Sequence, residues 1–108
     1  MKHFLFAFAL LSISANLSAE TLSNVTVRSI GISTNVDSSV TGNFTVVDKL
    51  SINCPYERIH FNINSDVGKA MYSTILTAKT TEKKLSKIDY FFSPGKRACL
   101  LRYVEIAD

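Results

Sequence analysis

The chain has 108 residues with twelve Lys and Arg against nine Asp and Glu, which gives a formal net charge of +3. Nucleic-acid-binding proteins usually carry a concentrated basic face, so this mild balance argues against a nucleic-acid partner. With only two histidines the chain cannot form a His cluster, and no metal site or other cofactor is predicted.

The N-terminus has the three parts of a secretory signal peptide. A basic start at Lys2 is followed by an uncharged apolar run over residues 4–11, and small residues lie near Ala19. The run is far shorter than the roughly twenty residues that span a bilayer, and no other such run follows. We therefore expect cleavage after residues 1–19, a single small domain over residues 20–108 with no membrane span, and a secreted or periplasmic location.

Two cysteines, Cys54 and Cys99, fall in the expected mature part. In an oxidising compartment an even cysteine count in a small domain favours a disulfide. Closing a loop of about 46 residues would stabilise the fold by roughly 4 kcal/mol in the chain-entropy model. A redox pair is disfavoured because the cysteines are far apart and form no CxxC motif.

The first half of the mature chain is predicted to be β-structure. Residues 25–32 alternate, but the phase changes at Ser29, which is typical of a bulge or a sharp bend. Residues 34–43 are rich in turn formers and predict a polar loop. Residues 44–47, β-branched and aromatic, predict a second strand.

A turn at residues 53–56 is followed by the clearest strand signal, residues 58–64. Ile59, Phe61 and Ile63 point to one face, and the intervening polar side chains point to the other.

The period then changes to that of a helix, predicted over roughly residues 66–79 and capped by Ser65 or Asp66. The expected buried face comprises Val67, Ala70, Met71, Thr74, Ile75 and Ala78. Strands at residues 88–92 and 100–106, joined by a turn at 93–97, complete the pattern.

Three strands, one helix and two strands predict a β-rich α+β fold. Closing five strands into a small OB-like barrel, with the helix between strands three and four covering one open end, would remove the exposed sheet edges. An open α+β sheet with one covering helix is the alternative.

The helical block over residues 67–79, followed by Glu82-Lys83-Lys84 and a strand, resembles small exported bacterial OB-fold proteins. These include the B subunits of AB toxins, especially the subtilase-cytotoxin type. The resemblance covers roughly residues 65–106 as element order and texture, with a disulfide in common. It implies a glycan-binding role and assembly into a pentameric ring, and it assigns no sugar-contacting residue here.

Catalytic motifs are missing from the sequence: it has no GxSxG, no glycine-rich phosphate loop and no HExxH. We therefore expect a non-enzymatic exported binding module with a glycan or protein ligand. The alternative is a periplasmic accessory or inhibitor protein that docks onto a partner protein.

OB-folds often bind through loops and through the face of their second and third strands. The expected ligand-binding residues are accordingly Asn35, Asp37, Arg58, His60, Lys96 and Arg97. Phe91 is predicted to point away from the core, which makes it the candidate anchor of a subunit interface. The sequence leaves the oligomeric state open.

Overall fold

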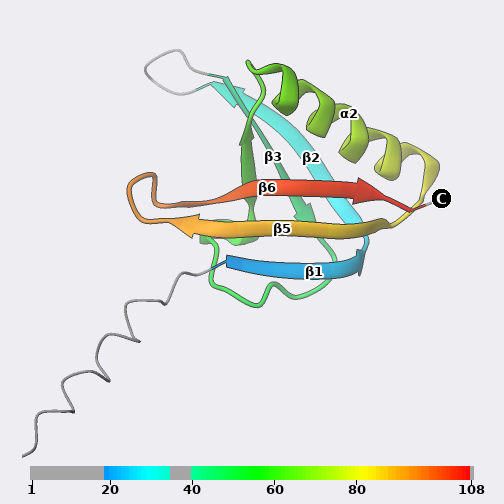
Figure 1. Ribbon diagram of the computed structural model, residues 1–108, viewed down its shortest axis with the longest axis horizontal. Coiled ribbons are helices and arrows are strands. Elements are labelled where there is room, and N and C mark those ends of the chain that lie inside the picture. Colours follow the sequence, from blue (N-terminus) through cyan, green and yellow to red (C-terminus); the bar gives the residue numbers. More distant parts are fainter. Residues whose placement is uncertain (1–18, 35–39, 108) are drawn as a thin grey trace, which may run out of the picture.

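A computed structural model describes residues 19–34 and 40–107. These residues form one six-stranded sheet covered by one helix (Figure 1). In these residues the strand order is β1-β5-β6-β4-β3-β2, with β4 and β6 parallel and every other pair antiparallel. The elements are β1 (Ala19–Val25), β2 (Val27–Thr34), β3 (Val40–Val46), the short 3-10 helix η2 (Pro55–Glu57), β4 (Ile59–Asn62), α2 (Asp66–Thr81), β5 (Leu85–Ser93) and β6 (Ala98–Ile106).

The first predicted strand is divided in two at Thr26. Its N–H donates to the Asp48 carboxylate at 3.1 Å, and its carbonyl accepts from the Val47 N–H at 2.9 Å, so neither group joins a ladder between neighbouring strands. β1 then pairs with β5 and β2 with β3, at opposite ends of the strand order. Six strands are therefore present among the described residues where five were expected, and the β-rich class with one helix is confirmed.

In the N-terminal half of the described chain, the irregularity of β2 was predicted correctly, whereas the starts of β1 and β3 were not. The irregularity expected at Ser29 is confirmed, because the register of β2 against β3 shifts between Val27 and Ser29. The strand itself begins at Ala19, and β3 begins at Val40, inside the stretch expected to be a loop.

Helix α2 is confirmed where the periodicity placed it. The Ser65 hydroxyl caps its N-terminus by accepting from the Gly68 N–H at 3.0 Å, and Glu82 ends it in a left-handed conformation. The helix packs against β2, β4 and β6. Its buried residues are Gly68, Ile75 and Ala78, whereas Val67, expected to be buried, is 65% exposed.

Gly68 lets α2 pack closely against the end of β4. A Cβ built at this glycine would lie 1.5 Å from the Asn62 carbonyl oxygen, so the helix approaches the end of β4 more closely than any side chain permits. Val67 and Ala70 line an open hollow between α2 and β6 and are exposed, so the prediction that they are buried was wrong.

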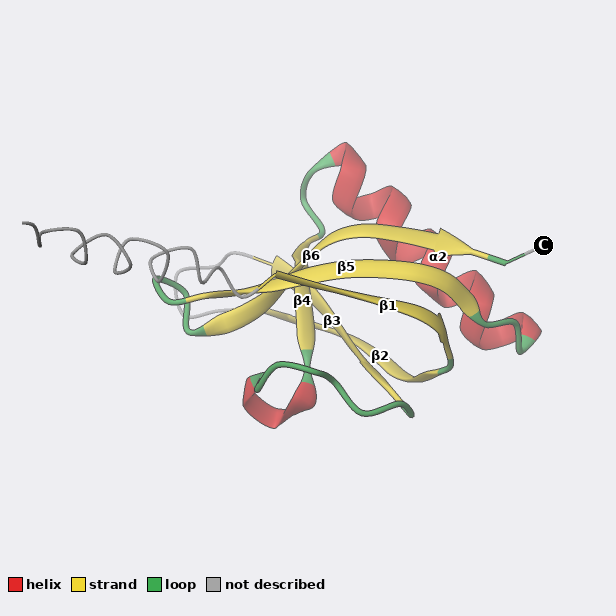
Figure 2. Cartoon of the chain, turned by 60° about the horizontal axis from the view of Figure 1, so that its bottom comes forward, coloured by secondary structure: helices red, strands yellow, loops and turns green. Residues whose placement is uncertain are grey.

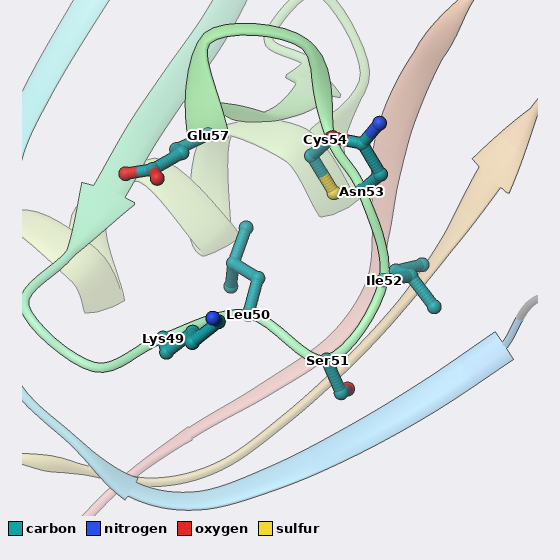
Figure 3. Close-up of a pocket in the computed structure, with 7 residues that line it drawn as sticks. All are labelled: Lys49, Leu50, Ser51, Ile52, Asn53, Cys54 and Glu57. Atoms are coloured by element: carbon teal, nitrogen blue, oxygen red, sulfur yellow. The ribbon is translucent and has the colours of Figure 1, made fainter.

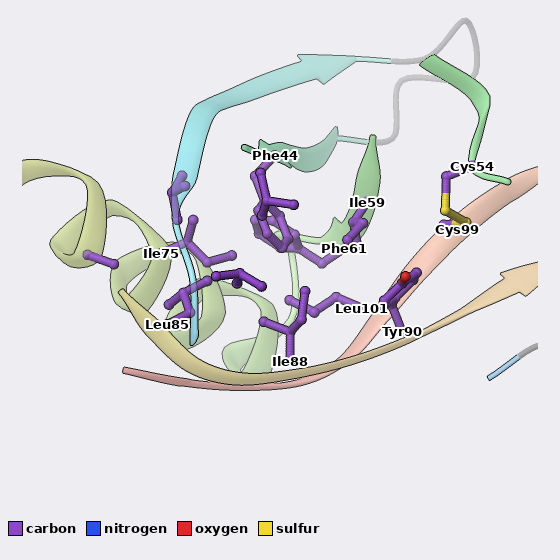
Figure 4. Close-up of a cluster of buried hydrophobic side chains, with 14 residues drawn as sticks. Phe44, Cys54, Ile59, Phe61, Ile75, Leu85, Ile88, Tyr90, Cys99 and Leu101 are labelled. Atoms are coloured by element: carbon purple, nitrogen blue, oxygen red, sulfur yellow. A yellow bond between two sulfur atoms is a disulfide. The ribbon is translucent and has the colours of Figure 1, made fainter. Parts of the chain in front are cut away.

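The core lies between the inner faces of the strands and α2, and its fully buried side chains include Phe44, Ile59, Ile75, Leu85, Ile88 and Tyr90. The expected alternation in β4 is confirmed at Ile59 and Phe61, which are both buried. Figure 4 shows α2 at one end of this core and the disulfide at the other. The predicted Cys54–Cys99 pairing is present, with the two Cα atoms 5.5 Å apart.

Candidate functional site

A row of paired residues crosses the outer face of the sheet, on the side away from the core. Each member is the register partner of the next, so that all six strands contribute one residue. We call it the outward row; its members, in strand order, are Gly31, Asn43, His60, Leu100, Phe91 and Ala19.

Asn43 is the buried polar centre of this row. It faces away from the core, yet only 7% of it is exposed. Its side-chain oxygen accepts a hydrogen bond from Arg58 Nη1 at 2.8 Å. Its neighbour in the row is Gly31, where a Cβ would lie in ordinary contact with that oxygen, at 3.6 Å. The hydrogen bond from Arg58 thus fixes the orientation of the amide.

His60 is half-buried beside Asn43, its register partner on β3. Burial lowers the pKa of the imidazole below its ordinary value, and the positive charge of Arg58 lowers that pKa further. The neutral ring that is favoured at neutral pH has one donor and one acceptor nitrogen. The structure therefore brings together the two strand residues predicted to bind ligand, Arg58 and His60, through their shared neighbour Asn43.

Phe91 lies farther along the outward row, next to Leu100. The ring is half-buried, and the guanidinium carbon of Arg102 lies 5.6 Å from its centroid. The expectation that Phe91 points outward is confirmed by this position. Sequence reasoning missed Asn43, Leu100 and Arg102, because their proximity to His60 and Phe91 depends on strand pairing.

Lys96 and Arg97 lie in the turn between β5 and β6, and both are exposed. The Lys96 N–H donates to the Ser93 carbonyl at 3.2 Å, and Arg97 has a left-handed φ of 53°. Phe91 and Leu100 pair a few residues from this turn, on β5 before it and on β6 after it, so its charges lie at the ends of these strands, to one side of the outward row. The other two predicted residues, Asn35 and Asp37, fall outside the described residues.

A second feature is the connection between β3 and β4, residues 47–58, where the sequence predicted a turn at 53–56 and placed Val47 and Arg58 in the flanking strands. It curves round a hollow of about 270 Å³, drawn in Figure 3. We call this the loop hollow; its lining residues are Lys49, Leu50, Ser51, Ile52, Asn53, Cys54 and Glu57. The Leu50 side chain points into the space that the loop surrounds (Figure 3).

Two other hollows lie against α2. One of about 300 Å³ lies at its C-terminal end, where Lys79, Lys83 and Lys84 gather near Thr26. The other, of about 240 Å³, separates α2 from β6. Within residues 19–34 and 40–107, no group of three His, Cys, Asp or Glu side chains could hold a metal ion. None of the helices described is long and apolar enough to cross a membrane.

Comparison with known proteins gives a likeness in fold. No protein-family model matches the chain, and no curated protein matches it in sequence. The crystal structure of the cholera toxin-like B-subunit from Citrobacter freundii matches with a TM-score of 0.56. The match covers 87% of this chain and 90% of the other at 13% identity. The predicted resemblance to B subunits of AB toxins is thus confirmed at the level of the fold.

Proposed function

We propose that this chain is an exported, non-enzymatic binding module that recognises a glycan through the outward row and the residues beside it. The observation that carries the proposal is the buried Asn43 amide, held by Arg58 and next to His60 on an outer sheet face. A protein that used this face only to exclude water would have no need of a fixed polar centre there. The toxin B-subunit fold supports a binding role.

The chemistry of the row suits a saccharide. Arg58 supplies charged donors, and the neutral His60 ring supplies a donor and an acceptor. The buried Asn43 amide, whose oxygen accepts from Arg58, positions the guanidinium beside them. Phe91 and Leu100 add an apolar surface on the same face. A sugar ring presents hydroxyl groups at its rim and C–H groups on its faces, so it can use both kinds of contact at once.

Export and barrel closure belong to the same proposal. Removal of residues 1–19 as a signal peptide would take Ala19 from the end of the outward row and leave Glu20, the second residue of β1, at the new N-terminus. The Cys54–Cys99 disulfide supports an oxidising compartment, periplasmic or extracellular. In the exported form, β1 and β2 act as one bent strand that closes the sheet into an OB-like barrel.

A glycan array screened with the disulfide-bonded protein tests the proposal. A His60→Ala, Phe91→Ala double variant should lose most of the binding seen with the unmodified protein. Lys79→Ala, an exposed change on α2, is the matched control and should bind as the unmodified protein does. A folded double variant that binds at full strength would remove the outward row from the site, and an array without any hit would overturn the glycan assignment.

Native mass spectrometry of the same samples measures the number of subunits. If Phe91 anchors contacts between copies, the double variant should dissociate into single chains. If the subunit count is unchanged and glycan binding is lost, Phe91 contacts ligand.

A further inference from the structure

The loop hollow is a preformed cavity, although the segment that surrounds it contains no strand. Cys54 ties the loop to β6 through the disulfide with Cys99. The Ser51 N–H donates to the hydroxyl of Tyr90 at 3.1 Å, and the Tyr90 side chain is fully buried in the core. Two rigid elements therefore hold the loop at two points, which lowers the entropy that a ligand would have to remove.

The backbone of the loop adopts a costly conformation next to the hollow. Tyr56 has φ 57° and ψ 19°, and Glu57 has φ 55°, so two consecutive non-glycine residues are left-handed. Each costs about 1–2 kcal/mol relative to ordinary backbone, and glycine would make the same turn without that cost. Such strain in native proteins clusters at binding and catalytic sites.

The left-handed turn at Tyr56 and Glu57 also determines which side chains line the hollow. Glu57 lines it together with Lys49 and Asn53, and Lys49, Asn53 and Glu57 are all exposed. The half-buried Leu50 supplies an apolar surface between these polar groups (Figure 3). Tyr56, the residue before Glu57, is 89% exposed. A carboxylate, an ammonium group, an amide and an apolar surface thus line one small cavity, beside an exposed aromatic ring.

We propose that the loop hollow binds the terminal sugar ring of the glycan. One C–H face of the ring packs on Leu50, and hydroxyl groups donate to the Glu57 carboxylate and accept from Lys49 and Asn53. At about 270 Å³ the hollow lies below the roughly 300–1,000 Å³ of sites for drug-sized ligands, which suits one ring and not a longer saccharide. This inference rests on the proposed function in taking the ligand to be a glycan, and it adds a site separate from the outward row.

The two sites are joined by consecutive residues. Glu57 lines the hollow, and Arg58 holds Asn43 in the outward row. The hollow and the outward row are therefore connected through one short stretch of chain.

Titration of the isotope-labelled, disulfide-bonded protein with methyl glycosides of glucose, galactose, mannose and N-acetylglucosamine, followed by two-dimensional amide NMR, tests the site. At least one glycoside should shift the amide signals of residues 49–57. Glu57→Gln should weaken that binding roughly tenfold or more, because it removes a charged acceptor. The matched control is Glu82→Gln at the far end of α2, which should bind as the unmodified protein does. If Glu57→Gln fails to fold, Asn53→Ala replaces it.

The outcomes separate this inference from the proposed function. Shifts confined to the outward row, or unchanged binding by Glu57→Gln, overturn the loop hollow as a sugar site and leave the proposed function standing. The loop hollow is overturned in the same way if glycan-array hits are lost with the His60→Ala, Phe91→Ala variant and kept with Glu57→Gln. Failure of every glycoside together with an empty array overturns both.

Discussion

The two ends of the core are covered in different ways. At one end lies α2, a regular helix with a capped N-terminus and a close backbone approach at Gly68. At the other lies the loop over residues 47–58, fixed by the Cys54–Cys99 disulfide and by the buried Tyr90 hydroxyl. Figure 2 shows the strands between α2 and this loop with its short helix η2.

The difference explains why the two ends can serve different purposes. A helix satisfies its own backbone hydrogen bonds, so α2 can cover the core with three buried residues and no external support. The irregular loop needs anchors from outside, and in return its backbone is free to turn left-handed and surround a cavity. The regular end is held by local contacts, whereas the irregular end is held by long-range anchors and surrounds the hollow for which a sugar ring is proposed.

Gly68→Ala should give the largest effect, at the helical end. The new methyl group would meet the Asn62 carbonyl oxygen at 1.5 Å, and backbone atoms cannot move aside as a flexible side chain can. We expect a loss of more than about 4 kcal/mol in the free energy of unfolding, measured by denaturant titration. Gly95→Ala is the matched control, since a Cβ there meets nothing within 4 Å. Equal stability of the two variants would contradict the close approach of α2 to β4.

Removal of the disulfide should be the next largest change, at the loop end. A Cys54→Ser, Cys99→Ser double variant loses the link across 45 residues, which stabilises the protein by roughly 4 kcal/mol in the chain-entropy model. The same denaturant titration, run on the unmodified protein with and without reductant, provides the control. If the variant and the reduced protein match the oxidised protein in stability, the disulfide has no role in holding this end.

Tyr90→Phe tests the second anchor of the loop with a smaller effect. The hydroxyl accepts from the Ser51 N–H, and its removal leaves that donor without this partner at a cost of about 1 kcal/mol. Amide hydrogen exchange should become faster at Ser51 and its loop neighbours and stay unchanged in α2. Faster exchange in both places would mean that Tyr90 supports the whole core and not the loop in particular.

The helical end was predictable from sequence, because a local periodicity and a nearby cap define a helix. Ser65 and the repeat from Val67 to Ala78 placed α2 within two residues of its observed end. Val67 and Ala70 were expected to be buried, but they line an open hollow against β6, and a periodicity does not show how much of an apolar face the neighbouring strands cover.

The loop and the outward row were harder to predict because both depend on contacts between distant residues. The anchor of Ser51 on Tyr90 joins residues 39 apart, and the neighbours of His60 come from β3 and β6. The positions of Arg58, His60 and Phe91 on the outer face could be predicted because strand alternation alone places side chains on a face. Asn43 was missed because it lies in a stretch whose polar residues predicted a loop.

The smallest predicted effect concerns His60, on the sheet between the two ends. Its pKa in the folded protein is lowered by burial and by Arg58, so the unfolded chain binds more protons in the pH range between that lowered pKa and the ordinary value of 6.5. His60 therefore contributes stability above pH 6.5 that is lost as the pH falls through this range.

Unfolding free energies at several pH values between 7.5 and 5 should fall more for the unmodified protein than for His60→Gln. In a protein that also carries Arg58→Ala, the effect of His60→Gln on the pH profile should be smaller but still present, because burial lowers the His60 pKa more than the Arg58 charge does. Identical pH profiles for the unmodified protein and His60→Gln would show that the imidazole is as well solvated in the folded protein as in the unfolded chain, and would remove the main reason to treat it as a fixed, neutral member of the outward row.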